Sequence, residues 1–443
     1  MVTCSSLRGE SRILPAGRVR RRAPHRTFGL HNTLGFIKNV SRDYDNQFAR
    51  TGAKIGNTIN VRLPNRYVVQ QGPAITPQAT AETSVALTLN RQWVVPMTFA
   101  SSELTLSIDE FSDRYIKPAI SKLASSIDLD CYQAAITGKF ADGVAVGGGA
   151  GPVNFTVGTP GTTPGVTGGS ATGLLQYNSP SVYLNAGRIL DINAAPRDKS
   201  RTICIDPAAN AQSVAGLSGL FNPQAVLSAQ YKNGLMGNGL GFDFVMDQNV
   251  FTLTAGTQLN TTAATMQATW TSGAAFSWTA DSSDNTKTLK AGSTFTVADC
   301  YHVNPETQQN TGVLMQWVVT ADKTLATGTN SISISPTPIV AGTGVANGNC
   351  SVAPTSGKAI TMTSGTAAVA SPMSLAFHKE AFVLGTADME LPPDVQAHRE
   401  SMDGISMRFL RQYDAMSDFS IYRIDVLGGF AVTRPELAVR IAG

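Results

Sequence analysis

Cys300 and His302 are the residues in this sequence whose types and spacing come nearest to a chemical site. They stand two apart in AGSTFTVADCYHVNPETQQN, residues 291–310, which alternates as a β-strand does. On a regular strand both side chains lie on one face, as two ligands of a metal site would. The sequence offers no evident third or fourth ligand. We therefore expect a half-buried cysteine beside a surface histidine, without a metal.

The other cysteines and histidines add no recognisable site. The cysteines are residues 4, 131, 204, 300 and 350, and the histidines are residues 25, 31, 302, 378 and 398. An odd number of cysteines without a C-x-x-C pair argues against a disulfide framework and against structural zinc. The histidines form no H-E-x-x-H motif. We expect reduced, mostly buried thiols, as in a protein made in the cytoplasm.

The remaining motifs do not form a catalytic or cofactor site either. GLSGL at 216–220 lacks the spacing of a nucleophile elbow, and GNGLG at 237–241 precedes a strand, which predicts a turn rather than a phosphate loop. The acid pairs Asp128/Asp130 and Asp109/Glu110 fall on or near a predicted helix, where a solvated face explains them. We expect no catalytic residue, no cofactor and no metal, and therefore no enzyme.

Two charged groups are candidates for contacts rather than for chemistry. Asp281, Asp284 and Lys287 share one polar turn, ADSSDNTKT, whose charges could pair across an interface. The first 26 residues carry seven Arg and one Glu, and Arg18, Arg20, Arg21 and Arg22 form the densest part. These arginines either contact nucleic acid by neutralising phosphates or belong to a disordered or mis-started leader.

The composition favours large interfaces. Only 15% of the 443 residues are charged, whereas 42% are hydrophobic. Burying amides and hydroxyls against a partner costs less than burying charges. The chain carries +3 and its first 26 residues +6, so the remainder carries −3. No apolar run reaches the roughly 20 residues of a membrane helix, and the N-terminus lacks the apolar middle of a secretory signal.

The spacing of apolar residues predicts the strands and helices of the first half of the chain. Ile59, Val61 and Leu63, and later Val85, Leu87 and Leu89, alternate with polar residues, which predicts one long hairpin over 51–100. A capping box at Ser107 and Glu110 opens a helix that reaches about residue 138, with Pro118 splitting or kinking it. Residues 143–187 carry no charge and predict a loop, which ends in a helix-like stretch.

Two later regions are rich in strands. Residues 251–370 consist of short Thr-rich strands and turns, which predicts a small β-barrel or sandwich inserted into a host fold. The closing stretch alternates as FSIYRIDVL and predicts strand, turn and strand.

In its order of elements the chain resembles the major coat proteins of tailed double-stranded DNA phages, which have the HK97-like fold. NTINVRLP, with VALTLNRQWVVPMTFASSELTLSIDEFSDRYIKPAISKLASSIDLD, resembles the family's E-loop and spine helix. KAGSTFTVADCYHVNPETQQNTGVLMQWVVTADKTL resembles the inserted I-domain of short-tailed-phage coat proteins. HKEAFVLGTADMELP and the ending GGFAVTRPELAVRI resemble the return to the A- and P-domains.

The resemblance implies an α+β, HK97-like fold with an inserted all-β I-domain barrel. The implied domains are an N-terminal arm (1–50), an E-loop hairpin (51–100), a P-domain spine helix (101–142), a first part of the A-domain (143–250), the I-domain (251–370), and a return through the A- and P-domains (371–443). The Asp281, Asp284 and Lys287 turn would lie between capsomers.

The resemblance also implies a function and partners. Copies of the chain would form hexamers and pentamers of an icosahedral virion capsid, assembled in the bacterial cytoplasm. A scaffolding protein and a portal would act during assembly, packaged DNA would be bound without sequence readout, and decoration proteins are further candidate partners; no membrane is implied. The alternative is a β-rich tail spike or a carbohydrate-binding or carbohydrate-degrading protein. It predicts acid clusters with aromatic platforms, whereas aromatic residues make up only 7% of the chain.

Overall fold

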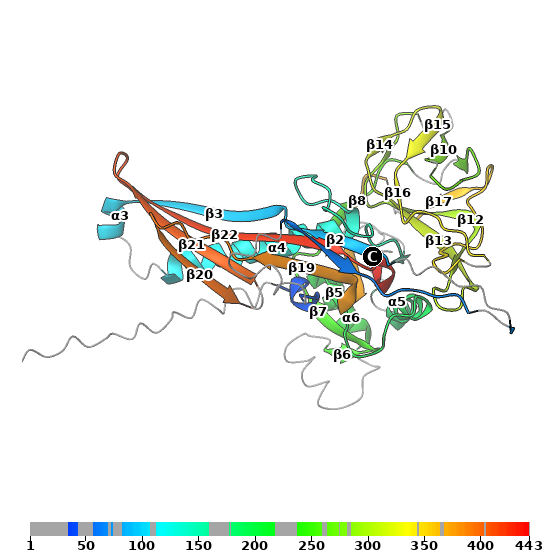
Figure 1. Cartoon of the computed structure of the whole chain (residues 1–443), viewed down its shortest axis with the longest axis horizontal. Helices are drawn as coiled ribbons and strands as arrows, with labels where there is room; N and C mark the ends of the chain where they lie inside the picture. Colours follow the sequence, from blue (N-terminus) through cyan, green and yellow to red (C-terminus); the bar gives the residue numbers. More distant parts are fainter. Residues whose placement is uncertain are drawn as a thin grey trace, which may run out of the picture.

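The computed structural model describes residues 34–42, 56–69, 72–73, 82–106, 112–158, 177, 179–217, 237–258, 264–273, 275–280, 285–342, 345–363, 367–402 and 405–442. Figure 1 shows an elongated molecule with a long sheet at one end, a central sheet with helices, and a separate group of strands at the other end. It is a mixed α and β fold with few helices and many strands.

A seven-stranded sheet forms the centre of the molecule. Its order is β4-β23-β18-β5-β7-β6, and β8 pairs with β18 off this path. The strands are β4 (Thr156–Val157), β5 (Arg201–Ile205), β6 (Asn238–Gly239), β7 (Phe242–Met246), β8 (Thr252–Thr254), β18 (Ala370–His378) and β23 (Ala438–Ala442). All five residues of β5 are buried, the apolar Ile203–Ile205 as predicted and Arg201 and Thr202 with them.

Two helices accompany this sheet, α5 (Pro180–Ile192) and α6 (Pro207–Leu217). Ser179 caps α5 by accepting a hydrogen bond from the Ser181 amide, and Pro180 occupies the first turn, where its missing N–H is no loss. The helix-like stretch expected before residue 196 is therefore confirmed. Residues 237–241 contain β6 and the predicted turn, which Leu240 and Gly241 form at positive φ between β6 and β7.

A five-stranded sheet extends away from the centre (Figure 1). Its strands are β3 (Arg91–Ala100), β19 (Phe382–Ala387), β20 (Gln396–Met402), β21 (Ile405–Asp414) and β22 (Phe419–Val432). The path is β19-β22-β21-β20, and β3 pairs with the other edge of β22. The predicted alternation of FSIYRIDVL is confirmed, because Tyr422, Ile424 and Val426 are buried.

The long helix α4 (Lys117–Thr137) packs against this sheet, and Ala119, Leu123 and Ile127 of its apolar stripe are buried. A π-helical segment (Ser112–Ile116) leads directly into α4, whereas the short helix α3 (Ser101–Leu106) is a separate element that follows β3. The predicted capping box lies outside the described residues. Pro118 stands in the first turn of α4, so the helix is divided just before the proline. Gly138 ends α4 in a left-handed conformation at φ 73°.

The predicted hairpin is shorter than expected. β1 (Thr58–Arg62) and β2 (Ser84–Thr88) pair antiparallel, with Val61 opposite Val85. Residues 91–100 instead form β3, which pairs with β22 along ten residues. The turn from β2 to β3 therefore carries the chain from a two-stranded ribbon into the long sheet.

Residues 265–362 form the strand-rich unit that the Thr-rich texture predicts. Its strands are β9 (Thr265–Met266), β10 (Phe276–Ala280), β11 (Thr288–Leu289), β12 (Thr294–Val303), β13 (Asn310–Val319), β14 (Lys323–Thr324), β15 (Gly328–Ile332), β16 (Ile334–Ser335) and β17 (Ile360–Met362). They make three sheets around Phe276, Trp278, Phe295 and Trp317. These sheets do not close into one ring among the described residues, so a closed barrel stays a prediction.

Three short 3-10 turns complete the described elements: η1 (Ile37–Asn39), η5 (Lys379–Ala381) and η6 (Pro435–Leu437). Of these, η1 lies in a short N-terminal segment, residues 34–42, that is built into the centre of the molecule. Leu34, Phe36, Ile37 and Val40 of this segment are all buried.

Candidate functional site

The Cys300 and His302 pair lies inside the strand-rich unit. Both side chains project from β12, and the exposed fractions are 1% for Cys300 and 6% for His302. The expectation of a surface histidine is therefore wrong. The His302 ring packs edge-on against Phe155 at 4.9 Å, and burial lowers its pKa to about 4, so the imidazole is neutral.

A second thiol completes this cluster without making a metal site. Cys350 pairs with His302 through a β-bridge, and its Sγ donates to the Ile339 carbonyl at 3.4 Å. The Cys300 Sγ donates to the Val352 carbonyl at 3.0 Å. Hydrogen bonding to Cys350 and burial raise the pKa of Cys300, which disfavours a reactive thiolate. Among the described residues, no three His, Cys, Asp or Glu side chains are grouped to hold a metal ion.

Asp128 and Asp130 on α4 are not on a solvated face, so that prediction is wrong. Their exposed fractions are 0% and 4%. The Asp130 carboxylate accepts from Arg91 Nη2 and Trp93 Nε1, both at 2.9 Å, and from the Ala141 amide at 2.7 Å. It thus joins β3, α4 and the segment after α4. The other acid pair, Asp109 and Glu110, lies outside the described residues.

The Asp128 carboxyl faces the opposite way, toward the N-terminal segment. Oδ1 of Asp128 accepts from the Ile37 amide at 2.9 Å, and Oδ2 of Asp247 accepts from the Phe36 amide at 3.1 Å. Sequence reasoning missed Asp247 and the role of residues 34–42. One signal was present: Asp128 stands four residues after Ala124 and four before Tyr132, on the buried stripe of the helix.

Arg440 is a second buried charge that the sequence did not reveal. It lies on β23 with an exposed fraction of 1%. Nη1 donates to the Gly292 carbonyl at 2.5 Å, and Nη2 donates to the Ile136 carbonyl at 2.6 Å. The first bond reaches the strand-rich unit, and the second satisfies a carbonyl in the last turn of α4, where a cation also complements the helix dipole. The end of the chain therefore ties these two parts together.

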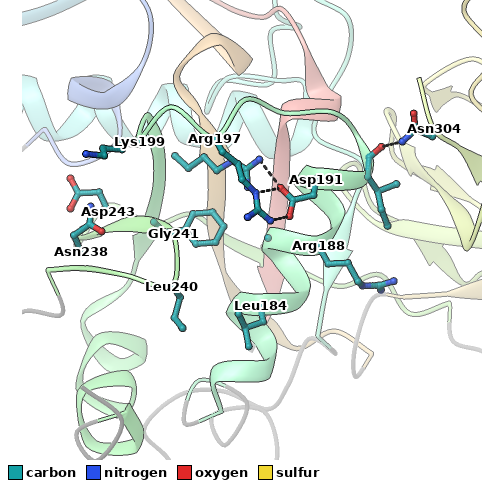
Figure 2. A pocket seen from close by; sticks show the side chains of 14 residues that line it. Leu184, Arg188, Asp191, Arg197, Lys199, Asn238, Leu240, Gly241, Asp243 and Asn304 are labelled. Carbon is teal, nitrogen blue, oxygen red and sulfur yellow. Dashed lines mark hydrogen bonds and ion pairs between the residues drawn. The ribbon is translucent and has the colours of Figure 1, made fainter. Parts of the chain in front are cut away.

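A cavity of about 640 Å³ lies between α5 and the β6–β7 turn (Figure 2). Asp191 occupies one wall and accepts from Arg197 and from Arg201 Nη2, the latter at 2.8 Å. The hydrogen bond from Arg197 lowers the pKa of Asp191, so this carboxylate is a poor general base. Arg188 and Lys199 also line the cavity.

The described lining contains no Ser, Thr, Tyr, Cys or His. Its apolar floor includes Phe242 and Leu240. The cavity can therefore receive an acidic or amphipathic segment.

Apolar side chains are exposed at two places where the chain projects from the body. Beyond β1, Tyr67 is 65% exposed and Val69 is 89% exposed. At the β21–β22 turn, Met416 is 96% exposed, beside the exposed Tyr413 and Phe419. Tyr413 Oη and Ser101 Oγ both donate to Asp418, so this turn is held in one shape by its own hydrogen bonds. Exposed apolar residues on fixed projections are typical of contact surfaces.

The predicted contact residues are mostly beyond the described part of the chain. Asp281 and Asp284 lie outside it, as do Arg18, Arg20, Arg21 and Arg22. Lys287 is described, half-buried just before β11, where its carbonyl accepts from the Leu325 amide at 2.8 Å. The contact role of this turn stays a prediction.

A family model described as "P22 coat protein - gene protein 5" matches residues 186–443, more than half of the chain. The chain belongs to the P22 coat protein family. As a member of this family, it is a major capsid protein of the HK97-like type and forms the head of a tailed phage. The match includes the whole strand-rich unit, Arg440 with its partner Gly292, and most of the long sheet. The tail-spike alternative has no support.

Structural similarities accompany the family match. A structure from Mycobacterium phage Che8 has 11% identity and a TM-score of 0.45, covering 92% of this chain and 90% of its own. The capsid of cyanophage P-SCSP1u has 11% identity and a TM-score of 0.43, covering 97% and 92%. The capsid of Ralstonia phage GP4 has 6% identity and a TM-score of 0.42, covering 99% and 97%. No curated protein matches the coat protein in sequence.

None of the helices described for the coat protein is both long enough and apolar enough to span a membrane.

Proposed function

We propose that this coat protein assembles as hexamers and pentamers of an icosahedral shell around double-stranded DNA, with residues beyond β1 lying on a neighbouring copy. The observation that carries this proposal is a difference in burial between the base of the β1–β2 ribbon and the residues beyond β1. Its base is fixed to its own body, because Val61 and Leu87 pack with Val383 and Ala431. A few residues further on, Tyr67 and Val69 are uncovered.

A ribbon of this kind is suited to contacts between copies. Two strands alone are marginally stable in water, so an extended ribbon gains from covering its apolar side chains. The Arg66 guanidinium, which pairs with Glu436 Oε1 at 3.2 Å, sets the direction in which the chain leaves the body. Tyr67 follows directly, and a partner copy that covers Tyr67 and Val69 supplies the missing burial.

The experiment compares assembly of the wild type with that of Tyr67→Ser combined with Val69→Ser. Negative-stain microscopy and size-exclusion chromatography of protein produced with its scaffolding partner report closed shells. We expect shells from the wild type and unassembled subunits from the variant, with unchanged circular dichroism. Val352→Ser, at a 46% exposed valine on the strand-rich unit, is the matched control and should assemble.

The possible outcomes test the contact beyond β1 and the assembly into shells separately. If the variant forms normal shells, the proposed contact beyond β1 is wrong. If the wild type never forms a closed shell, the assembly proposal itself is wrong.

The remaining partners belong to the same proposal. A scaffolding protein and a portal act in assembly in the host cytoplasm, and the inner face meets DNA without reading its sequence. The Arg-rich residues 18–22 and the turn with Asp281, Asp284 and Lys287 are candidates for DNA and capsomer contacts, and decoration proteins are candidate outer partners. We propose no catalytic activity, and the match to a coat protein family supports this.

A further inference from the structure

The N-terminal segment 34–42 is held in the centre of the molecule by two carboxyl groups. Phe36 sits among the rings of Tyr132, Phe377 and Phe382 at centroid distances of 5.0–5.3 Å. Its backbone is fixed by the amides of residues 36 and 37, which donate to Asp247 and Asp128. Aromatic packing alone fixes the ring, but these two bonds fix the path of the chain.

The approach of this segment to Asp247 is too close for any side chain. A Cβ added to Gly35 would lie 2.5 Å from Asp247 Oδ2. The Gly35 carbonyl also accepts from Asn39 Nδ2 at 2.9 Å, which closes the turn at η1. The acid pair and the segment therefore form one tightly fitted contact.

The two carboxyls also contact each other. Asn249 contacts both Asp128 and Asp247, so the two carboxyls lie close enough for a hydrogen bond between them, and both are buried, at 0% and 4% exposure. A hydrogen bond between two carboxyl groups requires that one of them carries a proton, since carboxylate oxygens only accept. Within the part of the chain that the structure describes, no ion pair joins a cation to either group. A proton is therefore what relieves the repulsion between them.

Neighbouring groups do not replace that proton. Asn249 contributes its amide N–H to Asp247 at 2.8 Å and its Nδ2 to Asp128 at 3.4 Å. Arg42, at the end of the segment, donates to the Ile37 carbonyl at 3.3 Å. The other titratable or charged groups around the pair are Cys131, Tyr132, Asp130 and Arg91 from α4 and β3, with Cys204 and Asp243 from β5 and β7. Burial raises the pKa values of both thiols and of the phenol, so these three are neutral.

We propose that Asp128 and Asp247 form a proton-dependent clasp, which holds residues 34–42 in the body while one proton is shared and loosens them when it is lost. The clasp stands on the contacts of this chain alone and does not depend on how the copies assemble. Ser41, at the end of the segment, bridges to Val383, which packs against β1 and β2. Loosening of the clasp is therefore transmitted toward the base of the ribbon.

The direction of the pH dependence follows from the protonation. Burial and the neighbouring Asp247 carboxyl raise the pKa of Asp128 well above its ordinary value. A group whose pKa is raised by folding stabilises the folded form fully below its unfolded pKa, near 4, and less as the pH rises toward the folded pKa. Docking of the segment is thus tightest at acidic pH. Because one proton is lost as the pH rises, the equilibrium constant for docking falls by up to about ten-fold per pH unit.

Hydrogen–deuterium exchange of the full-length protein tests the clasp. Protection of peptides covering 34–42 is measured at pH 6.0, 7.5 and 9.0, with correction for intrinsic exchange, and a β18 peptide serves as the internal reference. We expect protection of 34–42 in the wild type to fall at least ten-fold from pH 6.0 to 9.0, while β18 stays protected.

The matched variant is Asp128→Asn, which keeps an acceptor for the Ile37 amide and gives Asp247 a permanent donor. We expect its protection to be independent of pH, whereas Asp394→Asn, at an exposed acid, should follow the wild type. A flat wild-type profile overturns the clasp, and so does an Asp128→Asn variant that still loses protection. If residues 34–42 and β18 lose protection together, Asp128 and Asp247 stabilise the whole fold rather than this segment, and the clasp is wrong. The wild-type profile decides the matter even if the variant does not fold.

Discussion

Asp425 on β22 is the residue whose removal should damage the long sheet most. Its carboxylate is completely buried and lies directly opposite Arg408 of β21. Oδ1 accepts from Arg408 Nε at 3.1 Å. Oδ2 accepts from Arg408 Nη2 at 2.7 Å, from Arg423 Nε at 2.9 Å and from Gln92 Nε2 of β3 at 3.0 Å. One side chain therefore links three strands.

The substitution Asp425→Asn keeps the shape but leaves a single acceptor for four donors. Arg408, whose side chain is only 13% exposed, then keeps a buried charge without its partner. Breaking a buried ion pair in this way typically costs about 3–5 kcal/mol. With a urea m-value of about 3 kcal/mol/M, the unfolding midpoint should fall by about 1–2 M.

The assay is urea unfolding of the unassembled subunit, followed by tryptophan fluorescence, to which Trp93 on β3 in the same sheet contributes. Arg423→Gln is the matched control, because the Arg423 side chain is itself 40% exposed and a pair open to water contributes less than about 1 kcal/mol. The double variant Asp425→Asn with Arg408→Gln should recover part of the loss, since it removes the stranded cation. A loss below about 1 kcal/mol for Asp425→Asn, or an equal loss for Arg423→Gln, would refute this reasoning.

Three further outcomes are expected. Gly429→Ala places a Cβ 2.1 Å from the Thr88 carbonyl oxygen, so it should cost at least about 1–3 kcal/mol and lower shell yield, measured by thermal melting and microscopy. Gly187→Ala meets only ordinary contacts with Phe242 inside α5, so it should stabilise by about 0.5–1 kcal/mol; a loss in the same melt would contradict this. His302 has its pKa lowered to about 4, so stability should be full above about pH 6.5 and should fall by up to about 3 kcal/mol toward pH 4; His302→Phe should flatten this profile in melts at pH 7 and 4.5.

Patterns within one element were predictable from the sequence. The alternation of residues 419–427, the apolar stripe of α4 and the buried run of β5 each depend on local periodicity, and each is confirmed. The resemblance to tailed-phage coat proteins is confirmed by the family match. The position of Pro118 was less clear, since a proline at the start of a helix and one inside it look alike without the cap.

Contacts between distant parts of the chain were not predictable in this way. Asp128 was expected on a solvated face, because an acid on a helix is usually exposed, but its partners are the amides near residue 36 and Asp247. The pairing of β3 with β22 joins residues more than 300 positions apart, and nothing local in residues 91–100 distinguishes it from continuation of the ribbon. His302 was expected at the surface because histidine is polar. The sequence of one strand does not show which distant residue, here Phe155, covers such a side chain.

The strand-rich unit leaves the central sheet and returns to it at one point. β8 leads into the unit and β18 leads out, and these two strands are hydrogen-bonded neighbours, with Leu253 opposite Ser371. Because the two connections of the unit leave the central sheet on neighbouring strands, the distance between them does not depend on the size of the unit. Enlargement of this module away from β8 and β18 would leave the strand spacing of the host unchanged, whereas loss of the module would remove the Gly292 carbonyl that the buried Arg440 needs.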